Sequence, residues 1–201
     1  NVMAGYWKTP KATADTVVDG WLHTGDMGYI CPFDTDFLYV VGRFKSLLIS
    51  SDGEKYSPEA FEDSLPEVSK YVEAAVLHNN QSPYTIALIV PAREALADYA
   101  SKQGLDPASE EGRTAMLRKI QAEIDSYKTG GPHAALFPDR WLPAAVVICD
   151  EPFTIANGML NSTMKMVRRK VEEHYADRIA YAYTAEGKNL LNEKNLESIK
   201  I

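Results

Sequence analysis

The sequence has few cysteines, no long apolar run and no signal-peptide pattern. Its 201 residues include only two cysteines, Cys31 and Cys149, and neither belongs to a closely spaced Cys or His cluster. This excludes a disulfide framework or a zinc site as the basis of the fold and favours a reducing compartment, the cytoplasm. No apolar run approaches the ~18 residues of a membrane span, and residues 1–8 lack a signal-peptide pattern. We therefore expect a soluble protein.

An excess of positive charge is also missing, as are internal repeats and low-complexity segments. The formal net charge is -7. This charge argues against a nucleic-acid partner, because binding to a phosphate backbone needs clustered positive charge. The hydrophobic fraction of 45% is sufficient for one core. A single basic cluster, Lys165 with residues 168–170, needs a local explanation.

Strand and helix patterns interleave without strict alternation, which predicts the α+β class with a short mixed sheet flanked by helices. The apolar runs 72–77 and 84–90 predict a buried hairpin. Further strands are predicted at 37–41, 46–50 and 144–148, and helices at 11–16 with Thr9 as N-cap, from Ser57 to a stop at Pro66, at 93–103, at 114–127 and from Thr163 onward. Residues 187–201 are polar and weakly patterned, so they predict a tail that could contain one helical turn.

Three polar segments could carry chemistry: residues 20–26, residues 42–45 together with 50–55, and residues 157–165. Each also has a simpler interpretation. Asp26 could cap a turn, Arg43 could form a surface ion pair, and Asp52-Gly53 could be only a hairpin turn. Lys165 could begin a solvated basic face. Taken one at a time, the segments leave the function open.

In this order, the segments resemble the closing motifs of the adenylate-forming superfamily of acyl-CoA synthetases, luciferases and peptide synthetase adenylation domains. Residues 5–7 read GYW and residues 19–28 read DGWLHTGDMG, which resembles the family passage almost letter for letter. Residues 42–49, GRFKSLLI, and 53–59, GEKYSPE, resemble the hinge motif in its long-chain fatty acyl-CoA synthetase form. Residues 157–165, NGMLNSTMK, resemble the last motif, with Asn161-Ser162 in place of Thr-Pro.

The resemblance implies a division into two parts. Residues 1–44 would be the tail of a large AMP-binding domain, and residues 45–201 a mobile C-terminal domain with a helical insert at about 93–142. The complete polypeptide would be a fatty acid–CoA ligase that joins a carboxylate to AMP from Mg-ATP and then lets CoA displace AMP. The phosphate loop, adenine pocket, acyl tunnel and Mg²⁺ site would lie in the preceding large domain, its partner. This chain alone is expected to be inactive.

The resemblance also assigns roles to single residues. Asp26, an acceptor-only carboxylate, would bind the ribose hydroxyls of ATP or AMP with Thr24 beside it. Arg43 would bind ribose and phosphate oxygens with its guanidinium fork. Lys165 would be the catalytic residue, bridging the substrate carboxylate and the α-phosphate as their charges meet. Lys45 would be the hinge, at the end of a strand.

The turn at residues 51–55 would line the channel for CoA. Gly53 lacks a Cβ, so its backbone could approach the pantetheine arm, with Ser51, Glu54 and Lys55 beside it. The arginines and lysine at 168–170 would either meet CoA phosphates or form a solvated helix face. No metal site is expected in the chain.

Two other classes of function stay open. One is a non-catalytic module that binds CoA, AMP or a protein partner, with which the Asn161-Ser162 departure is consistent. The other is a structural domain in which Lys165 and Asp26 are ordinary surface residues. Only the style of the motifs points to long acyl chains. Association with the inner face of a membrane is compatible with such substrates, although no amphipathic basic helix demands it.

Overall fold

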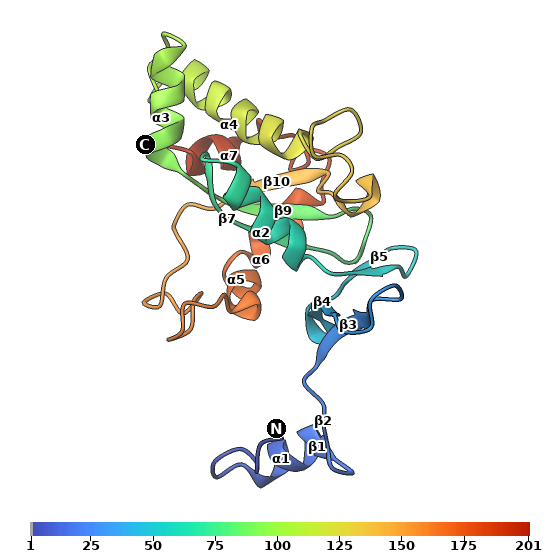
Figure 1. Cartoon of the computed structure of the whole chain (residues 1–201). Coiled ribbons are helices and arrows are strands. Elements are labelled where there is room, and N and C mark those ends of the chain that lie inside the picture. Colours follow the sequence, from blue (N-terminus) through green and yellow to red (C-terminus); the bar gives the residue numbers. More distant parts are fainter. Residues whose placement is uncertain (1) are drawn as a thin grey trace. The chain divides into compact units, whose positions relative to one another are not determined.

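The computed structural model describes residues 2–201, so Asn1, the first residue of the predicted tail domain 1–44, lies outside the described residues. The chain separates into two compact units, Asn1–Leu47 and Leu48–Ile201 (Figure 1), which are described in turn. Short mixed sheets and helices confirm the α+β class. Across the described part of the chain, no helix is both long and apolar enough to cross a membrane.

The first unit has little core of its own. Its elements are α1 (Pro10–Thr16), the antiparallel pair β1 (Val17–Val18) and β2 (Trp21–Leu22), the antiparallel pair β3 (Asp26–Ile30) and β4 (Leu38–Arg43), and the 3-10 turn η1 (Phe44–Ser46). Within residues 2–47 only Gly42 is buried. Trp7, Trp21 and Phe33 are 86%, 77% and 96% exposed. So many exposed aromatic side chains are typical of a segment that packs against another domain or protein.

A three-stranded sheet organises the second unit, with strand order β10-β9-β7. The central strand β9 (Ile86–Pro91) pairs antiparallel with β7 (Val72–His78), which confirms the predicted pairing, and parallel with β10 (Ala145–Ile148). All six residues of β9 are buried. The strand is apolar without alternation because both faces of the sheet are covered.

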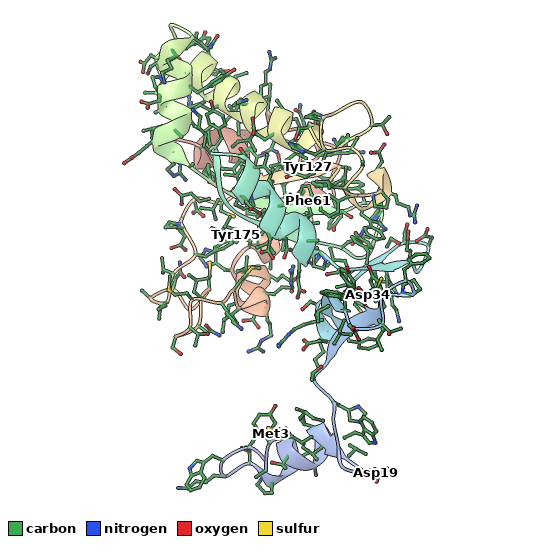
Figure 2. All side chains as sticks on the ribbon, viewed as in Figure 1. Met3, Asp19, Asp34, Phe61, Tyr127 and Tyr175 are labelled. Carbon is green, nitrogen blue, oxygen red and sulfur yellow. The ribbon has the colours of Figure 1, made fainter. Side chains whose placement is uncertain are left out.

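Helices cover the two faces of this sheet unequally. One face, which includes Ile89, packs against α2 (Glu59–Val68), α3 (Arg93–Lys102), α4 (Glu110–Asp125) and α7 (Glu193–Ser198); the other, which includes Leu88, packs against α5 (Arg168–His174) and α6 (Ala176–Ala182). Phe61 of α2 and Tyr127 after α4, both labelled in Figure 2, pack edge to face with ring centroids 5.2 Å apart. Leu117, Ile120 and Ile124, on one face of α4, are fully buried.

A smaller sheet carries the turn predicted to line the CoA channel. Its central strand β5 (Leu48–Ser50) pairs antiparallel with β6 (Lys55–Tyr56) and parallel with β8 (Asn80–Ser82). The turn 51–54 therefore joins β5 and β6 as a short hairpin.

Several predicted boundaries are wrong. Helix α2 continues through Pro66 to Val68, and the Ser69 amide donates to the Leu65 carbonyl at 2.9 Å. The burial of Phe61 and Leu65 outweighs the one backbone hydrogen bond that proline removes. Helix α4 begins at Glu110 rather than at 114, because the Ser109 hydroxyl caps it by accepting from the Gly112 amide.

The helix expected from Thr163 also begins later than predicted. It starts at Arg168, because residues 159–167 form a hairpin, and it is divided at Tyr175 into α5 and α6. Thr9 does occupy the N-cap of α1, yet its hydroxyl donates to the Trp7 carbonyl rather than accepting from the helix.

The C-terminal segment contains the short helix α7, as the sequence allowed, but it packs against the core and is not a tail. Ile199 is fully buried and Asn195 is 1% exposed. The Asn195 side-chain amide accepts from the Ile148 N–H at 3.0 Å and donates to the Val146 carbonyl at 2.9 Å. The Asn195 side chain therefore pairs with the backbone groups on the outer edge of β10, as the backbone of another strand would. A polar residue makes this contact, so hydrophobic periodicity could not reveal it.

Replacing Asn195 by alanine should leave the Ile148 N–H and the Val146 carbonyl buried without partners. A buried unsatisfied polar group costs about 1–3 kcal/mol, so we expect Asn195→Ala to lower the free energy of unfolding by about 3 kcal/mol in urea titrations. Asn189→Ala, at an exposed position of the same segment, is the matched control and should lower it by less than about 1 kcal/mol. Equal losses in both variants would contradict the edge-pairing role.

Candidate functional site

Three predicted nucleotide-binding residues come together in the first unit. Asp26 and Arg43 are register partners on β3 and β4, and Arg43 Nε lies 3.1 Å from Asp26 Oδ1. The Thr24 hydroxyl accepts from the Asp26 amide at 3.1 Å. The Phe44 amide donates to the Gly25 carbonyl at 2.9 Å, which closes the end of the strand pair.

This arrangement fits the groups of a nucleotide. An acceptor-only carboxylate suits a ribose diol, and the adjacent guanidinium suits phosphate or ribose oxygens. The side chains of Arg43 and Asp26 are 64% and 35% exposed, so both remain accessible. The ion pair that was the simpler interpretation of Arg43 is present, and it holds the carboxylate in place.

The predicted hinge residue lies near the division between the two units. Lys45 is the middle residue of η1, the turn between β4 and β5, rather than the last residue of a strand as expected. The first unit ends at Leu47. A single exposed turn is a backbone segment that can absorb a change in φ and ψ, so the hinge remains a prediction.

Lys165 lies on a tight hairpin in the second unit. Leu160 and Met166 form a bridge at its base, and the Val167 amide donates to the Met159 carbonyl at 2.8 Å. The backbone of Met164 has φ +61°, a left-handed conformation that a non-glycine residue adopts only under constraint.

The Asn161 side chain organises the turn of this hairpin. Its Oδ1 accepts from the Thr163 amide and from the Lys165 amide, both at 2.9 Å. The family motif has Thr-Pro where this chain has Asn161-Ser162. Hydrogen bonds accepted by Asn161 Oδ1 thus fix a turn that a proline ring would restrict by its fixed φ. The Lys165 side chain is exposed, and its ammonium has no hydrogen-bond or ion-pair partner among residues 2–201.

Arg168, at the first position of α5, is neither solvated nor free to meet a phosphate. Its guanidinium donates to both carboxylate oxygens of Glu62, at 2.8 and 2.6 Å, and to the Leu77 carbonyl at 2.7 Å. Glu62 is 6% exposed and also accepts from the Leu77 amide at 2.6 Å. The base of the Lys165 hairpin is thereby attached to α2 and β7. Both predicted roles of Arg168 are therefore replaced by a structural one.

Burial raises the pKa of the Glu62 carboxyl above its usual value, and the Arg168 guanidinium followed by the Leu77 amide opposes this rise. The remaining residues of the basic cluster behave as expected of a solvated face. Arg169 and Lys170 are exposed and pair with Glu173 at 3.5 and 3.2 Å.

The turn predicted to line a CoA channel is held by residues that the sequence did not single out. Arg140 binds both carboxylate oxygens of Glu54, and the Trp141 indole N–H donates to Glu54 at 3.2 Å. The hydrogen bond from Arg140 holds the pKa of Glu54 below its usual value. Gly53 has φ +85° with open space around its Cα, consistent with a close approach by another group.

The other predicted residues of this turn are placed differently. Ser51 and Lys55 are exposed, Ser51 in the turn and Lys55 in β6. A hydrogen bond from Ser50 lowers the pKa of Asp52 in the same turn. An Arg-Trp pair 86 residues beyond Glu54 carries no local sequence signal for this contact.

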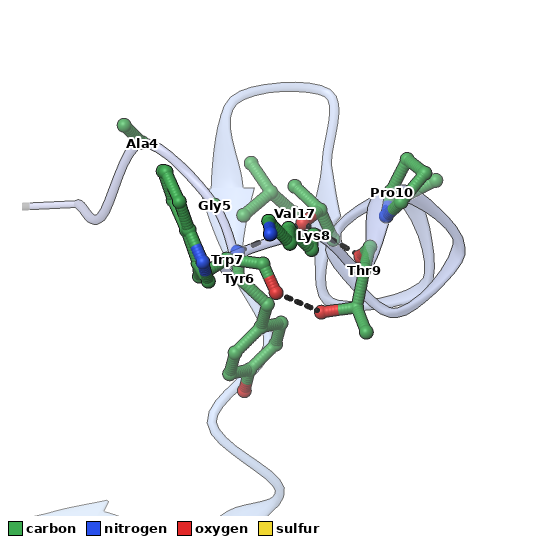
Figure 3. A pocket seen from close by; sticks show the side chains of 10 residues that line it. Ala4, Gly5, Tyr6, Trp7, Lys8, Thr9, Pro10 and Val17 are labelled. Carbon is green, nitrogen blue, oxygen red and sulfur yellow. Dashed lines mark hydrogen bonds between the residues drawn. The ribbon is translucent and has the colours of Figure 1, made fainter.

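An open pocket of about 640 Å³ is formed by residues 4–10 with Thr13, Ala14 and Val17 (Figure 3). The Gly5-Tyr6-Trp7 passage lines it, and the Tyr6 amide donates to the Thr13 hydroxyl at 2.9 Å. None of the predicted site residues contributes to it, so it adds no chemistry to the nucleotide site.

The sequence model of the family described as "AMP-binding enzyme C-terminal domain" matches residues 45–187. The chain belongs to this family. It is 32% identical over 202 residues to the probable acyl-activating enzyme 16 of Arabidopsis thaliana, covering 90% of the chain and 26% of that protein. It is 31% identical to the long-chain-fatty-acid–CoA ligase 1 of Homo sapiens, covering 92% and 26%. It is 30% identical to the long-chain-fatty-acid–CoA ligase FadD15 of Mycobacterium tuberculosis, covering 92% and 30%.

Solved structures agree with this assignment. The adenylation domain of a carboxylate reductase from Mycobacterium chelonae matches 90% of the chain and 26% of its own length at 27% identity, with a TM-score of 0.73. The A-PCP didomain of a carboxylic acid reductase from Segniliparus rugosus, solved with AMP, matches 90% and 23% at 27% identity, with a TM-score of 0.68. The chain therefore spans between about a quarter and a third of the length of the curated relatives it matches.

Replacing Arg168 by methionine leaves the buried Glu62 carboxylate without its charged partner and should lower the free energy of unfolding. Removing one partner of a buried ion pair typically costs about 3–5 kcal/mol, and we expect a loss of this size at pH 7. Without Arg168 the folded-state pKa of Glu62 rises further above its unfolded value. A carboxyl whose pKa is raised by folding stabilises the folded state at low pH, and this stabilisation is lost as the pH rises through the folded-state pKa. Part of the free energy of unfolding that Arg168→Met loses at pH 7 should therefore be regained toward pH 5.

The matched control for this experiment is the double variant Glu62→Gln/Arg168→Met, measured by urea unfolding at the same two pH values. It has no carboxyl to titrate at position 62, so its difference from the wild type should depend less on pH. If the single and double variants showed the same pH dependence, Glu62 would not be the group responsible.

The role of Asn161 can be tested through its acceptor oxygen. Asn161→Ala removes the bonds to the Thr163 and Lys165 amides, so exchange of these two amide hydrogens should accelerate roughly fivefold for a hydrogen bond of about 1 kcal/mol. Asn161→Asp retains an acceptor and should exchange like the wild type. Amide exchange followed by NMR distinguishes the two, and equal acceleration in both variants would show that the acceptor is not what holds the turn.

Proposed function

We propose that this chain is the C-terminal part of an ATP-dependent acyl-CoA synthetase of the fatty acid–CoA ligase type. Residues 1–44 would complete a large AMP-binding domain, and residues 45–201 would be the mobile domain. The observation that carries the proposal is that Thr24, Asp26 and Arg43 are assembled by β3, β4 and the loop before them, in a chain whose sequence belongs to the AMP-binding enzymes. The bare aromatic surface of the first unit supports a large domain as the partner.

In the first half-reaction, a carboxylate oxygen would attack the α-phosphate of ATP and expel pyrophosphate. The Asp26 carboxylate would accept hydrogen bonds from the ribose hydroxyls, and Arg43 would donate to ribose and phosphate oxygens. The Lys165 ammonium would stabilise negative charge where the carboxylate meets the phosphate. The Mg²⁺ that accompanies ATP would be bound by the large domain, as the resemblance to the family implies.

In the second half-reaction, the CoA thiolate would attack the acyl carbon and release AMP. A change at Lys45 would withdraw Lys165 and bring in the turn 51–55. The long-chain substrate is supported by the printed names of the human and mycobacterial relatives. The carboxylate reductase relatives share the adenylation architecture, so a different acceptor of the acyl group is the second candidate.

The decisive experiment measures pyrophosphate release by the complete polypeptide with palmitate and ATP. Lys165→Ala should slow release about 10²–10³-fold, the usual effect of removing one group that stabilises transition-state charge. Asp26→Ala should raise the KM for ATP, because it removes contacts made to the nucleotide in both ground and transition states.

Lys170→Ala is the matched control, because Lys170 is a nearby exposed lysine on α5 that pairs with Glu173. It should release pyrophosphate at the wild-type rate. If Lys165→Ala were equally fast, the proposal would fail in favour of a non-catalytic binding module. Pyrophosphate release without transfer to CoA would favour the second candidate.

A further inference from the structure

The helical insert contacts the turn predicted to line the CoA channel through its last residues. The 3-10 turn η2 (Asp139–Trp141) lies at the end of the insert. Arg140 Nη2 donates to Glu54 Oε1 at 2.6 Å, and Arg140 Nε donates to Glu54 Oε2. The Trp141 indole N–H donates to Glu54 Oε1 at 3.2 Å. One carboxylate thus accepts three hydrogen bonds from two adjacent residues of the insert.

Contacts with β6 and with the insert hold Trp141 and η2 in place. The Trp141 ring stacks on Tyr56, with centroids 5.4 Å apart and an interplanar angle of 11°. Tyr56 is 3% exposed and its hydroxyl bonds Thr85. The Thr129 amide donates to Asp139 at 3.0 Å, which attaches η2 to the segment that follows α4. Arg140 and Trp141 are therefore held from both sides.

The turn itself is a stiff unit. The Gly53 amide donates to the Ser50 carbonyl at 2.9 Å, and the Ser50 amide donates to the Glu54 carbonyl at 3.0 Å. The Glu54 amide donates to Asp52 at 3.1 Å. Since these bonds fix the internal shape of the turn, a contact at Glu54 sets the direction in which its tip, with Ser51 and Gly53, points.

The Arg140–Glu54 pair is better suited to orienting the turn 51–55 than to stabilising the fold. The Arg140 side chain is 64% exposed and that of Glu54 is 28% exposed. Exposed ion pairs contribute little to folding, because water and salt screen them. A bidentate arginine–carboxylate pair nevertheless has a defined geometry, which a lysine or a single hydrogen bond cannot reproduce.

We propose that Arg140 and Trp141 are positioning residues for thioester formation: by holding Glu54, they orient the turn 51–55 toward the incoming CoA. The helical insert then has a specific task in the second half-reaction and none in the first. This inference rests on the proposed function, because the turn is assigned to the CoA channel there. Neither residue touches CoA in this account, and each acts through Glu54.

The test separates the two half-reactions in the complete polypeptide. Pyrophosphate release reports adenylation, and transfer from preformed palmitoyl-adenylate to CoA reports thioester formation. We expect Arg140→Met to raise the KM for CoA about fivefold, the upper range for an exposed ion pair, with pyrophosphate release unchanged. Trp141→Phe keeps the ring on Tyr56 and loses only the indole N–H, so its effect should be smaller and in the same direction.

Lys128→Met is the matched control, because it breaks another exposed ion pair of the insert, with Asp125 at 2.7 Å, away from the turn. It should change neither half-reaction. Hydrogen exchange of the peptide that contains Gly53 and Glu54 gives a readout independent of activity, and it should accelerate in Arg140→Met but not in Lys128→Met.

Equal slowing of both half-reactions by Arg140→Met would indicate a merely structural role and would overturn the inference. Unchanged CoA kinetics in Arg140→Met, beside a collapse of adenylation in Lys165→Ala, would overturn this inference while leaving the proposed function intact. A wild-type protein that releases pyrophosphate and transfers nothing to CoA would instead overturn the CoA step of the proposed function, and the inference with it.

Discussion

The buried pair of Glu62 and Arg168 is the interaction on which the second unit depends most. A charge removed from water is tolerable only when its hydrogen-bonding capacity is met, and here the carboxylate, the guanidinium and both polar groups of Leu77 satisfy one another. The pair joins α2, β7 and the start of α5 across 106 residues of sequence. The hairpin of Lys165 therefore takes its place only when the core of the unit has assembled.

The predictions that succeeded rest on dense local signals. The apolar runs at 72–77 and 84–90 are strands because a strand covered on both faces needs uninterrupted apolar side chains, and they pair as expected. The closing motifs placed the chain in its family because several of them occur in a fixed order. Aspartate and arginine at positions 26 and 43 were assigned to one site from the motifs alone, and the strand register brings them together.

The failures concern contacts between polar groups far apart in sequence. Hydrophobic periodicity contains no information that Arg168 reaches Glu62 or that Arg140 reaches Glu54, so the sequence alone predicts solvent or CoA as the partner of Arg168 and predicts no partner for Arg140. Pro66 failed as a stop signal because tertiary burial outweighs one lost backbone bond. The family pattern likewise does not reveal that Asn161 can fix this turn where the proline is absent, since hydrogen bonding and ring closure restrict a turn by different means.

The contact between Asn195 and β10 has a consequence beyond the stability of one monomer. An outer strand with unpaired amides and carbonyls is a template on which strands of other molecules can assemble. The match to the family model ends at residue 187, eight positions before the asparagine that occupies this edge. A domain that ends at residue 187 would retain the sheet and lose the segment that pairs with the outer edge of β10. Self-association of such a truncated domain would then reflect its chosen boundary rather than any property of the natural fold.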